Sequence, residues 1–129
     1  LVIGDPAHVP AGQYAKHWLE SRRLPGGKTL WDAVQGRLSP MPDVRAALMQ
    51  VRGNSRLVGM VYRTDYQLEK DELKLLYAIP LEQSGPILYS VAEITGGSTP
   101  QAKAFLDYLH SAEAKRVFEH YGFIHMADE

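Results

Sequence analysis

Short apolar runs along the chain alternate with stretches in which apolar residues recur every three or four positions. The runs cover residues 1–4, 57–62, 73–79 and 87–94, and glycine, proline or charged residues bound each of them. Such runs are typical of buried β-strands, whereas the wider spacing is typical of helices with one apolar face. We therefore predict an α/β domain with a mostly parallel sheet flanked by helices.

Five predicted helices have recognisable starts. Pro10 suits a first helical position, Thr29 can cap a short second helix, and Pro42 or Asp43 leads into a third after a turn at residues 39–43. Two more helices follow the break at residues 96–100, and Gly122 ends the last. The positions expected to face inward are Ala11, Tyr14, Ala15, Trp18 and Leu19, then Val44, Ala47, Leu48 and Val51, and finally Ala102, Phe105, Leu106, Leu109, Ala114, Val117, Phe118 and Tyr121.

Composition and charge fit one globular domain without a broad charged surface. The chain has 129 residues, of which 45% are hydrophobic, and its 14 Lys and Arg residues nearly balance 15 Asp and Glu residues. We therefore expect no nucleic-acid partner, and any anion must be bound by local groups. The chain lacks cysteine, and it opens at Leu1 within an apolar run and without a signal peptide. We interpret it as starting inside a longer protein.

Three segments suit anion binding on structural grounds. In open α/β sheets, ligands bind beyond the carboxyl ends of the strands, where helices begin with free N–H groups. Residues 5–12 and residues 42–44 each lead into such a helix start, and Tyr62 ends a predicted strand and offers a hydroxyl group. Helix starts of this kind occur in nearly every α/β domain, so neither one alone indicates a ligand site. Taken alone, Tyr62 is more simply interpreted as an aromatic residue at the edge of the core than as a ligand contact.

Enzymatic activity is an alternative, because Asp5 and His8 resemble an acid–base pair near Tyr62. A loop before a helix more often carries such residues to hydrogen-bond its own backbone. The sequence shows no nucleophile elbow, phosphate loop, zinc-protease motif or dinucleotide fingerprint. We therefore predict no catalysis and no cofactor. The other histidines lack the spacing of metal ligands, and we interpret them as surface residues: His17, His110, His120 and His125.

The strongest functional signal lies at residues 4–16, Gly-Asp-Pro-Ala-His-Val-Pro-Ala-Gly-Gln-Tyr-Ala-Lys. This segment resembles the signature Gly-Asp-Pro-x-His-Val-Pro-Ala-Gly-x-Tyr-Ala of periplasmic molybdate-binding proteins. Segments at residues 43–48, 59–65, 103–109 and 118–123 resemble the same family in the same order. The resemblance implies one lobe of a type II periplasmic binding protein, namely its C-terminal half.

The resemblance also implies a set of ligand contacts. Carried over residue by residue, it assigns the backbone N–H groups of Ala11 and Val44 and the phenol hydroxyl of Tyr62 to a bound oxyanion, molybdate or tungstate. The resemblance implies no cofactor, and it implies molybdenum or tungsten only as part of the bound oxyanion. The family's remaining contacts come from two serine loops of the first lobe, which would precede Leu1. We therefore expect this chain alone to bind about two to four decades more weakly than a two-lobed protein.

The family architecture suggests a division of the chain and a set of partners. Residues 1–95 would form the ligand-binding second lobe without its first strand, and residues 96–129 would be helices that pack on the missing first lobe. The implied setting is the periplasm, with an inner-membrane ABC permease as partner. The exposed apolar faces of the last helices would let copies of the chain pair. The chain departs from the family at Met41-Pro42 and in a slightly long segment at residues 23–29. An effector-sensing domain of a regulator is the second alternative.

Overall fold

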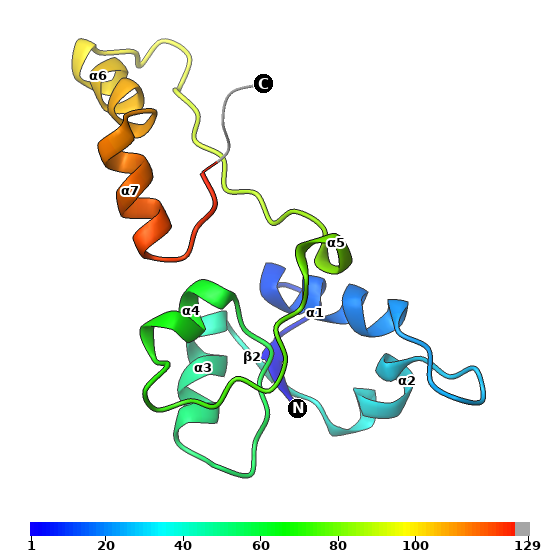
Figure 1. The fold of residues 1–129 in the computed structure, drawn as a ribbon. Helices are drawn as coiled ribbons and strands as arrows, with labels where there is room; N and C mark the ends of the chain where they lie inside the picture. Colours follow the sequence, from blue (N-terminus) through cyan, green and yellow to red (C-terminus); the bar gives the residue numbers. More distant parts are fainter. Residues whose placement is uncertain (126–129) are drawn as a thin grey trace. The chain divides into compact units, whose positions relative to one another are not determined.

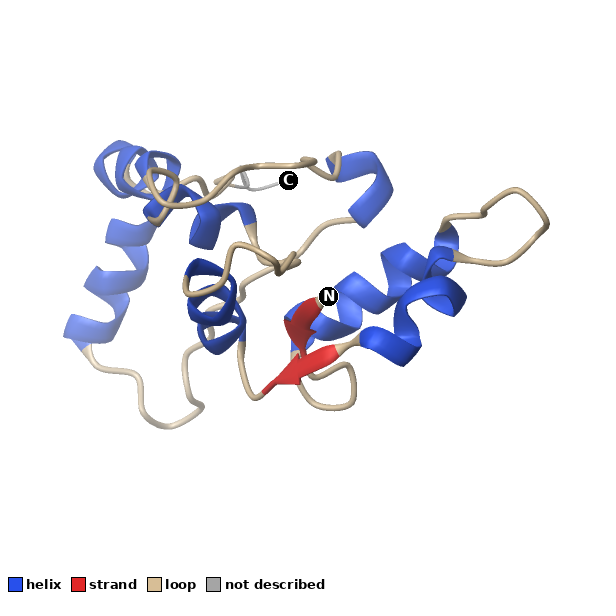
Figure 2. Cartoon of the chain, turned by 90° about the horizontal axis from the view of Figure 1, so that it is seen from below, coloured by secondary structure: helices blue, strands red, loops and turns tan. Residues whose placement is uncertain are grey.

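The computed structural model describes residues 1–125. The chain divides into two compact units, Leu1–Pro86 and Ile87–Glu129, which we call the N-terminal and C-terminal units. Helices predominate over strands in both units (Figures 1 and 2). The N-terminal unit contains β1 (Val2–Gly4), α1 (Pro10–Ser21), α2 (Leu30–Val34), η1 (Gln35–Arg37), β2 (Ser39–Met41), α3 (Val44–Arg52), α4 (Arg63–Leu68) and α5 (Leu81–Ser84). The C-terminal unit contains α6 (Pro100–Leu109) and α7 (Ala112–His120).

The sheet of the N-terminal unit is small and parallel. Strand β1 pairs in parallel with β2, and Val2 lies opposite Ser39. A single parallel bridge joins Val2 to Gly59, with the Val2 N–H donating to Val58 O at 2.8 Å and the Met60 N–H donating to Val2 O at 3.0 Å. Strand β1 therefore lies between two parallel extended segments. The chain is an α/β protein with a parallel sheet flanked by helices, as predicted.

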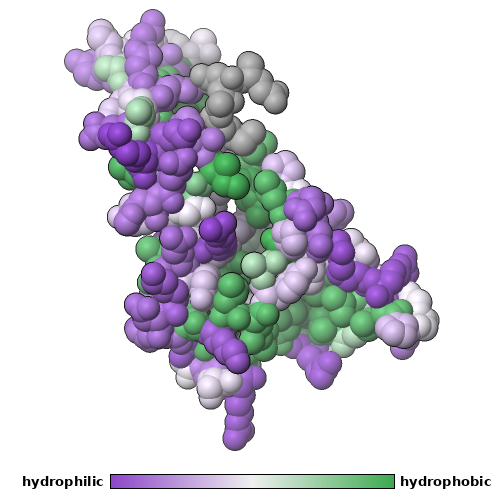
Figure 3. Space-filling model, in the orientation of Figure 1, coloured by the Kyte–Doolittle hydropathy of each residue, from purple (hydrophilic) through white to green (hydrophobic). Residues whose placement is uncertain are grey.

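The predictions of strands at residues 57–62, 73–79 and 87–94 were wrong. Within residues 1–125 the first of these runs makes only the bridge at Gly59, and the other two belong to no strand. A strand needs a neighbouring backbone to hydrogen-bond, and no described segment forms a ladder with either of them. Apolar residues reach the molecular surface (Figure 3), and several of these lie in the two runs. They are Leu75, Leu76, Tyr77, Leu88, Tyr89, Val91 and Ile94.

Other departures from the prediction concern short elements. Residues 39–41 form β2, where we expected a turn, and Pro40 is tolerated there because β2 is an edge strand. Helix α4 begins one residue after Tyr62, and α5 follows Pro80; neither helix was predicted. With six and four residues, both helices are too short to show a helical repeat in the sequence.

The core of the N-terminal unit surrounds β1. Val2 and Ile3 are fully buried, and β1 contacts both α1 and α3. The other buried apolar side chains of these helices are Ala11, Ala15, Leu19, Ala47 and Leu48, as predicted. On α1, Tyr14 is 37% exposed and Trp18 is only partly buried, where we expected inward positions. Helix α1 can lie directly against the end of β1 because residue 12 is glycine: a Cβ added there would overlap the carbonyl oxygen of Gly4.

The predicted helix caps are confirmed. The Thr29 hydroxyl accepts a hydrogen bond from the Asp32 N–H at 3.0 Å, and the Asp32 carboxylate accepts one from the Thr29 N–H at 2.8 Å, which is a capping box. The Asp43 carboxylate caps α3 by accepting from the Ala46 N–H at 2.7 Å. These side chains explain why the helix starts could be predicted from sequence.

The C-terminal unit contains the two helices predicted after the break at residues 96–100. Thr99 and Ser111 cap α6 and α7, and Gly122, with a φ of 87°, follows the end of α7. Ala114 is buried, but Phe105 and Val117 are 58% and 49% exposed, where we expected inward positions. Phe118 and Tyr121 are also exposed, at 36% and 50%. Helices α6 and α7 pack on each other. This contact alone does not cover their apolar side chains, so much of their apolar surface stays exposed.

Candidate functional site

The three predicted ligand-binding residues follow three parallel segments of the N-terminal unit. Ala11 is the second residue of α1, which follows β1, and Val44 is the first residue of α3, which follows β2. Tyr62 is the N-cap of α4 and stands three residues beyond the bridge at Gly59. Because the three segments run in the same direction, all three residues lie beyond the carboxyl edge of the sheet. The fold therefore gathers them at one edge.

Helix α1 begins without a side-chain cap. The Val9 carbonyl accepts hydrogen bonds from the N–H groups of Gly12 and Gln13 at 2.9 and 3.0 Å, and Pro10 has no N–H. Among residues 1–125, no group accepts a hydrogen bond from the Ala11 N–H. The first turn of α1 therefore has one unused donor, which belongs to the residue that the sequence predicted as a ligand contact.

Helix α3 has a capped start that also leaves a donor unused. The Asp43 side chain accepts from the Ala46 N–H, and the Asp43 carbonyl accepts from the Ala47 N–H at 3.2 Å. The described part of the chain supplies no acceptor for the Val44 N–H. Val44 is half-buried. A ligand with acceptor atoms can therefore hydrogen-bond here without displacing a contact of the folded chain.

Tyr62 belongs to a polar cluster that the sequence did not predict. Its carbonyl accepts from the Tyr66 N–H at 3.1 Å, and its backbone amide hydrogen-bonds the carboxyl group of Asp65. Asp65 is only 6% exposed, and its Oδ1 lies 3.3 Å from Nε of Arg45, which follows Val44 on α3. Burial raises the pKa of Asp65, although Arg45 and the Tyr62 amide act in the opposite direction.

The hydrogen bonds of Asp5 and His8 in the described part of the chain are with the backbone of their own loop. The Asp5 carboxylate accepts from the Ala7 N–H at 2.9 Å, and the Asp5 carbonyl accepts from the His8 N–H at 3.1 Å. The His8 side chain is exposed. Asp5 therefore stabilises its own loop, as a polar residue before a helix commonly does. Residues 1–125 hold no group of three or more His, Cys, Asp or Glu residues arranged to bind a metal ion.

A hollow of about 510 Å³ lies next to this loop, but it is not lined by the predicted contacts. Lys16 lies at its wall with Nζ 5.2 Å from the ring centre of Trp31. The lining residues are Asp5, Pro6, Ala7, Lys16, Trp31, Gln35, Leu38 and Pro40. The hollow and the three predicted contact residues are therefore separate places in the described part of the chain.

The fold and these helix starts are those of an α/β protein with unused backbone donors at one edge of a parallel sheet. Residues 1–124 match the family of bacterial extracellular solute-binding proteins, and the chain belongs to this family. None of the helices in residues 1–125 has the length and apolar character of a membrane span.

Two curated relatives are molybdate-binding proteins named ModA. The chain is 39% identical over 123 residues to ModA of Haemophilus influenzae, a match that covers 95% of the chain and 46% of the relative. It is 37% identical over 123 residues to ModA of Escherichia coli, covering 95% of the chain and 45% of that relative. The chain therefore spans somewhat less than half the length of these relatives. The predicted membership of a family of bacterial solute-binding proteins is confirmed.

Proposed function

We propose that the chain binds molybdate or tungstate as part of the soluble receptor of an ABC importer. The similarity to molybdate-binding proteins along 95% of the chain is the observation that carries this proposal. The N–H groups of Ala11 and Val44 also support it, because unused donors at helix starts are suited to binding an anion. The similarity gives no support to a regulator's effector domain or to an enzyme that uses Asp5 and His8.

The proposed donors explain how such a site selects its ligand. Two backbone amides and the phenol of Tyr62 are neutral groups that donate hydrogen bonds, and each contributes about 1.5–3 kcal/mol toward a charged acceptor. Hydrogen phosphate carries a proton that needs an acceptor, and these groups offer none. The site therefore favours a fully ionised tetrahedral dianion, and the size of the cavity would distinguish molybdate from sulfate.

The remaining parts of the proposal concern the whole receptor. Residues 1–95 would form the ligand-binding lobe, and residues 96–129 would pack on a first lobe that supplies further donors. Ligand contacts to both lobes would favour a closed form, which an inner-membrane permease would recognise in the periplasm. The ligand is the only bound group that we assign, and no catalytic step is part of the proposal.

The test is a calorimetric titration of the chain with sodium molybdate. The parent chain should bind weakly, and Val44→Pro should weaken binding by about 10- to 100-fold, because proline removes the N–H but suits a first helical position. Asp43, with a φ of −158° and a ψ of 172°, already has the extended backbone that precedes proline. Ala112→Pro is the matched control, since Ala112 is the first residue of α7 and follows an extended Ser111.

Two results of the titration would contradict the proposal. If Val44→Pro binds molybdate as tightly as Ala112→Pro does, the Val44 amide is not a ligand contact. If the parent chain shows no heat of binding at millimolar molybdate, the proposed function of this chain is wrong.

A further inference from the structure

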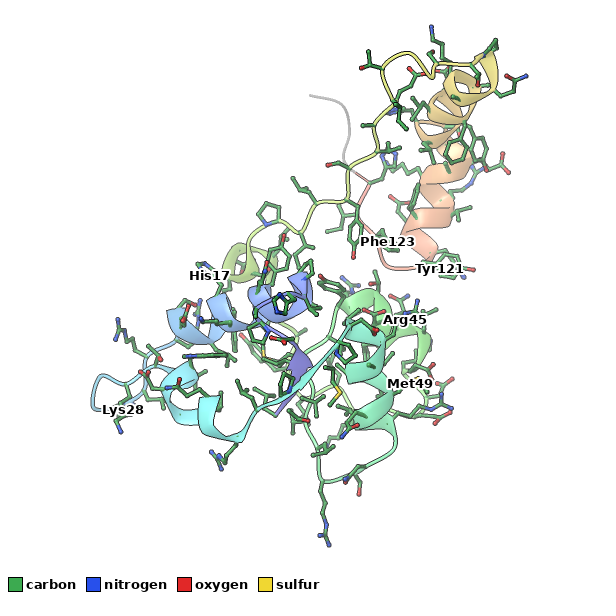
Figure 4. The ribbon with its side chains drawn as sticks, turned by 180° about the vertical axis from the view of Figure 1, so that it is seen from behind. His17, Lys28, Arg45, Met49, Tyr121 and Phe123 are labelled. Atoms are coloured by element: carbon green, nitrogen blue, oxygen red, sulfur yellow. The ribbon has the colours of Figure 1, made fainter. Side chains whose placement is uncertain are left out.

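The cluster around Asp65 joins the starts of two helices that carry proposed ligand contacts. Asp65 lies in the first turn of α4, three residues after Tyr62, and its carboxyl group binds the backbone amide of Tyr62. Its Oδ1 is also 3.3 Å from Nε of Arg45, the second residue of α3, which follows Val44. Figure 4 labels Arg45 on α3. One carboxyl group thus contacts Tyr62, a proposed contact residue, and Arg45, the neighbour of Val44.

This carboxyl group is poorly placed for stability alone. The Asp65 side chain is only 9% exposed, and its Oδ2 is buried without a hydrogen-bond partner among residues 1–125. A buried carboxylate oxygen without a donor costs free energy, and such groups in folded proteins call for an explanation. The Arg45 side chain is 68% exposed, so water screens its attraction for Asp65.

We propose that Asp65 is the positioning residue of the oxyanion site, which fixes the start of α3 through Arg45 and the start of α4 through the Tyr62 amide. The inference rests on the proposed function, because it concerns the geometry of the same donors. Donor groups must be held within a fraction of an ångström to converge on a small anion. A group that links the starts of α3 and α4 does this for the Val44 N–H and the Tyr62 hydroxyl. Asp65 itself does not touch the ligand.

Charge and position predict opposite effects of replacing Asp65. Its negative charge repels a dianion bound nearby, so Asp65→Asn would tighten binding if charge alone mattered. If Asp65 positions the donors, the same variant weakens binding, because the neutral amide holds Arg45 and the Tyr62 amide less strongly. The sign of the change in molybdate affinity therefore shows whether Asp65 acts mainly through its charge or by positioning the donors.

The structure supplies a matched control on the same helix. Arg52, the last residue of α3, donates from Nε and Nη2 to the carboxylate of Glu72 at 2.6 and 2.7 Å, and its Nη1 lies 3.3 Å from Glu69. This ion pair connects the C-terminal end of α3 to the segment that follows α4. Glu72→Gln removes one negative charge, as Asp65→Asn does, but it acts away from the helix starts.

The experiment follows backbone amides of the full chain by NMR during titration with sodium molybdate, in parallel with urea unfolding. Asp65→Asn should weaken the apparent affinity by about five- to tenfold, whereas Glu72→Gln should leave it unchanged even if it lowers the free energy of unfolding. Hydrogen exchange of the Tyr62 amide, measured without ligand, should quicken several-fold in Asp65→Asn and in Arg45→Gln but not in Glu72→Gln.

Equal or tighter binding by Asp65→Asn would overturn the inference while the molybdate site still stands. If the parent chain does not bind molybdate, the proposed function fails, and the exchange measurement still judges the link between the helices. Faster exchange of the Tyr62 amide in Arg45→Gln would support that link, and unchanged exchange would overturn it.

Discussion

Two aspartates occupy equivalent places in first helical turns, yet folding changes their pKa values in opposite directions. Asp32, three residues after Thr29, accepts hydrogen bonds from the Thr29 backbone and hydroxyl, and these lower its pKa. Asp65, three residues after Tyr62, has its pKa raised because burial outweighs its contacts with Arg45 and the Tyr62 amide. Sequence position alone does not distinguish the two residues. Their exposure to water distinguishes them, because burial raises the free energy of an ionised carboxyl group.

The raised pKa of Asp65 predicts a specific pH dependence of stability. The folded chain holds the Asp65 proton more tightly than the unfolded chain, so this group's contribution to the free energy of unfolding falls as pH rises from the ordinary Asp value through the raised value. Asp65→Asn removes this contribution. The free energy of unfolding of the variant, relative to the parent, should therefore increase across that window and then level off.

Urea denaturation at a series of pH values from about 2 to 7 measures this difference. Asp32→Asn is a useful comparison because the sign is reversed. The lowered pKa of Asp32 stabilises the fold above the ordinary Asp value, and this stabilisation is lost as pH falls through the lowered value. Parallel stability curves for Asp65→Asn and the parent would contradict a raised pKa of Asp65 in the folded chain.

At the scale of elements, helices could be predicted well and strands poorly. A helix satisfies its own backbone, so Thr29, Asp43 and the apolar spacing of α1 and α3 carry the necessary information locally. A strand depends on a neighbour that can lie far away in sequence. The run at residues 73–79 has strand-like composition, yet no described segment pairs with it. The helix starts of the site were therefore predictable, but Arg45 and Asp65, which meet across two helices, were not.

The contact between α1 and β1 gives a prediction at this scale. A side chain at position 12 would strike the backbone at Gly4, which cannot move as a flexible side chain could. Gly12→Ala should therefore lower the free energy of unfolding by about 2–3 kcal/mol, at the upper end of the usual cost of overpacking. It should also weaken molybdate binding, because the Ala11 amide would shift.

Gly36→Ala is the control for this variant, because a Cβ at Gly36 would have no heavy atom within 4 Å. Chemical denaturation of the two variants and the parent makes the comparison. Equal stability of Gly12→Ala and Gly36→Ala would mean that α1 does not lie directly against the end of β1.

At the scale of the whole molecule, the chain leaves much apolar surface without a covering partner. Phe105 and Val117 in the C-terminal unit, and Leu76 in the N-terminal unit, are about half exposed or more. Exposed apolar surface of this extent is typical of chains that associate. The curated relatives are about twice as long as the chain, and a segment of the remaining length would be large enough to cover such surface.

We expect the chain by itself to associate with copies of itself through the helices of the C-terminal unit. Light scattering should give an average mass that rises with protein concentration, and the double variant Phe105→Gln, Val117→Gln should reduce this rise by removing exposed apolar area. Ala104→Gln, on the same exposed helix, should leave it unchanged. A monomer at the highest attainable concentration would contradict the expectation.

The central claim is that the backbone amides of Ala11 and Val44 and the hydroxyl of Tyr62 converge on one tetrahedral dianion. Crystals of the chain soaked in sodium molybdate, with diffraction recorded at the molybdenum absorption edge, test it most directly. We predict an anomalous peak whose oxyanion oxygens lie within about 3.2 Å of these three donors. A peak in the hollow beside Lys16 and Trp31, with none near Ala11 and Val44, would contradict it.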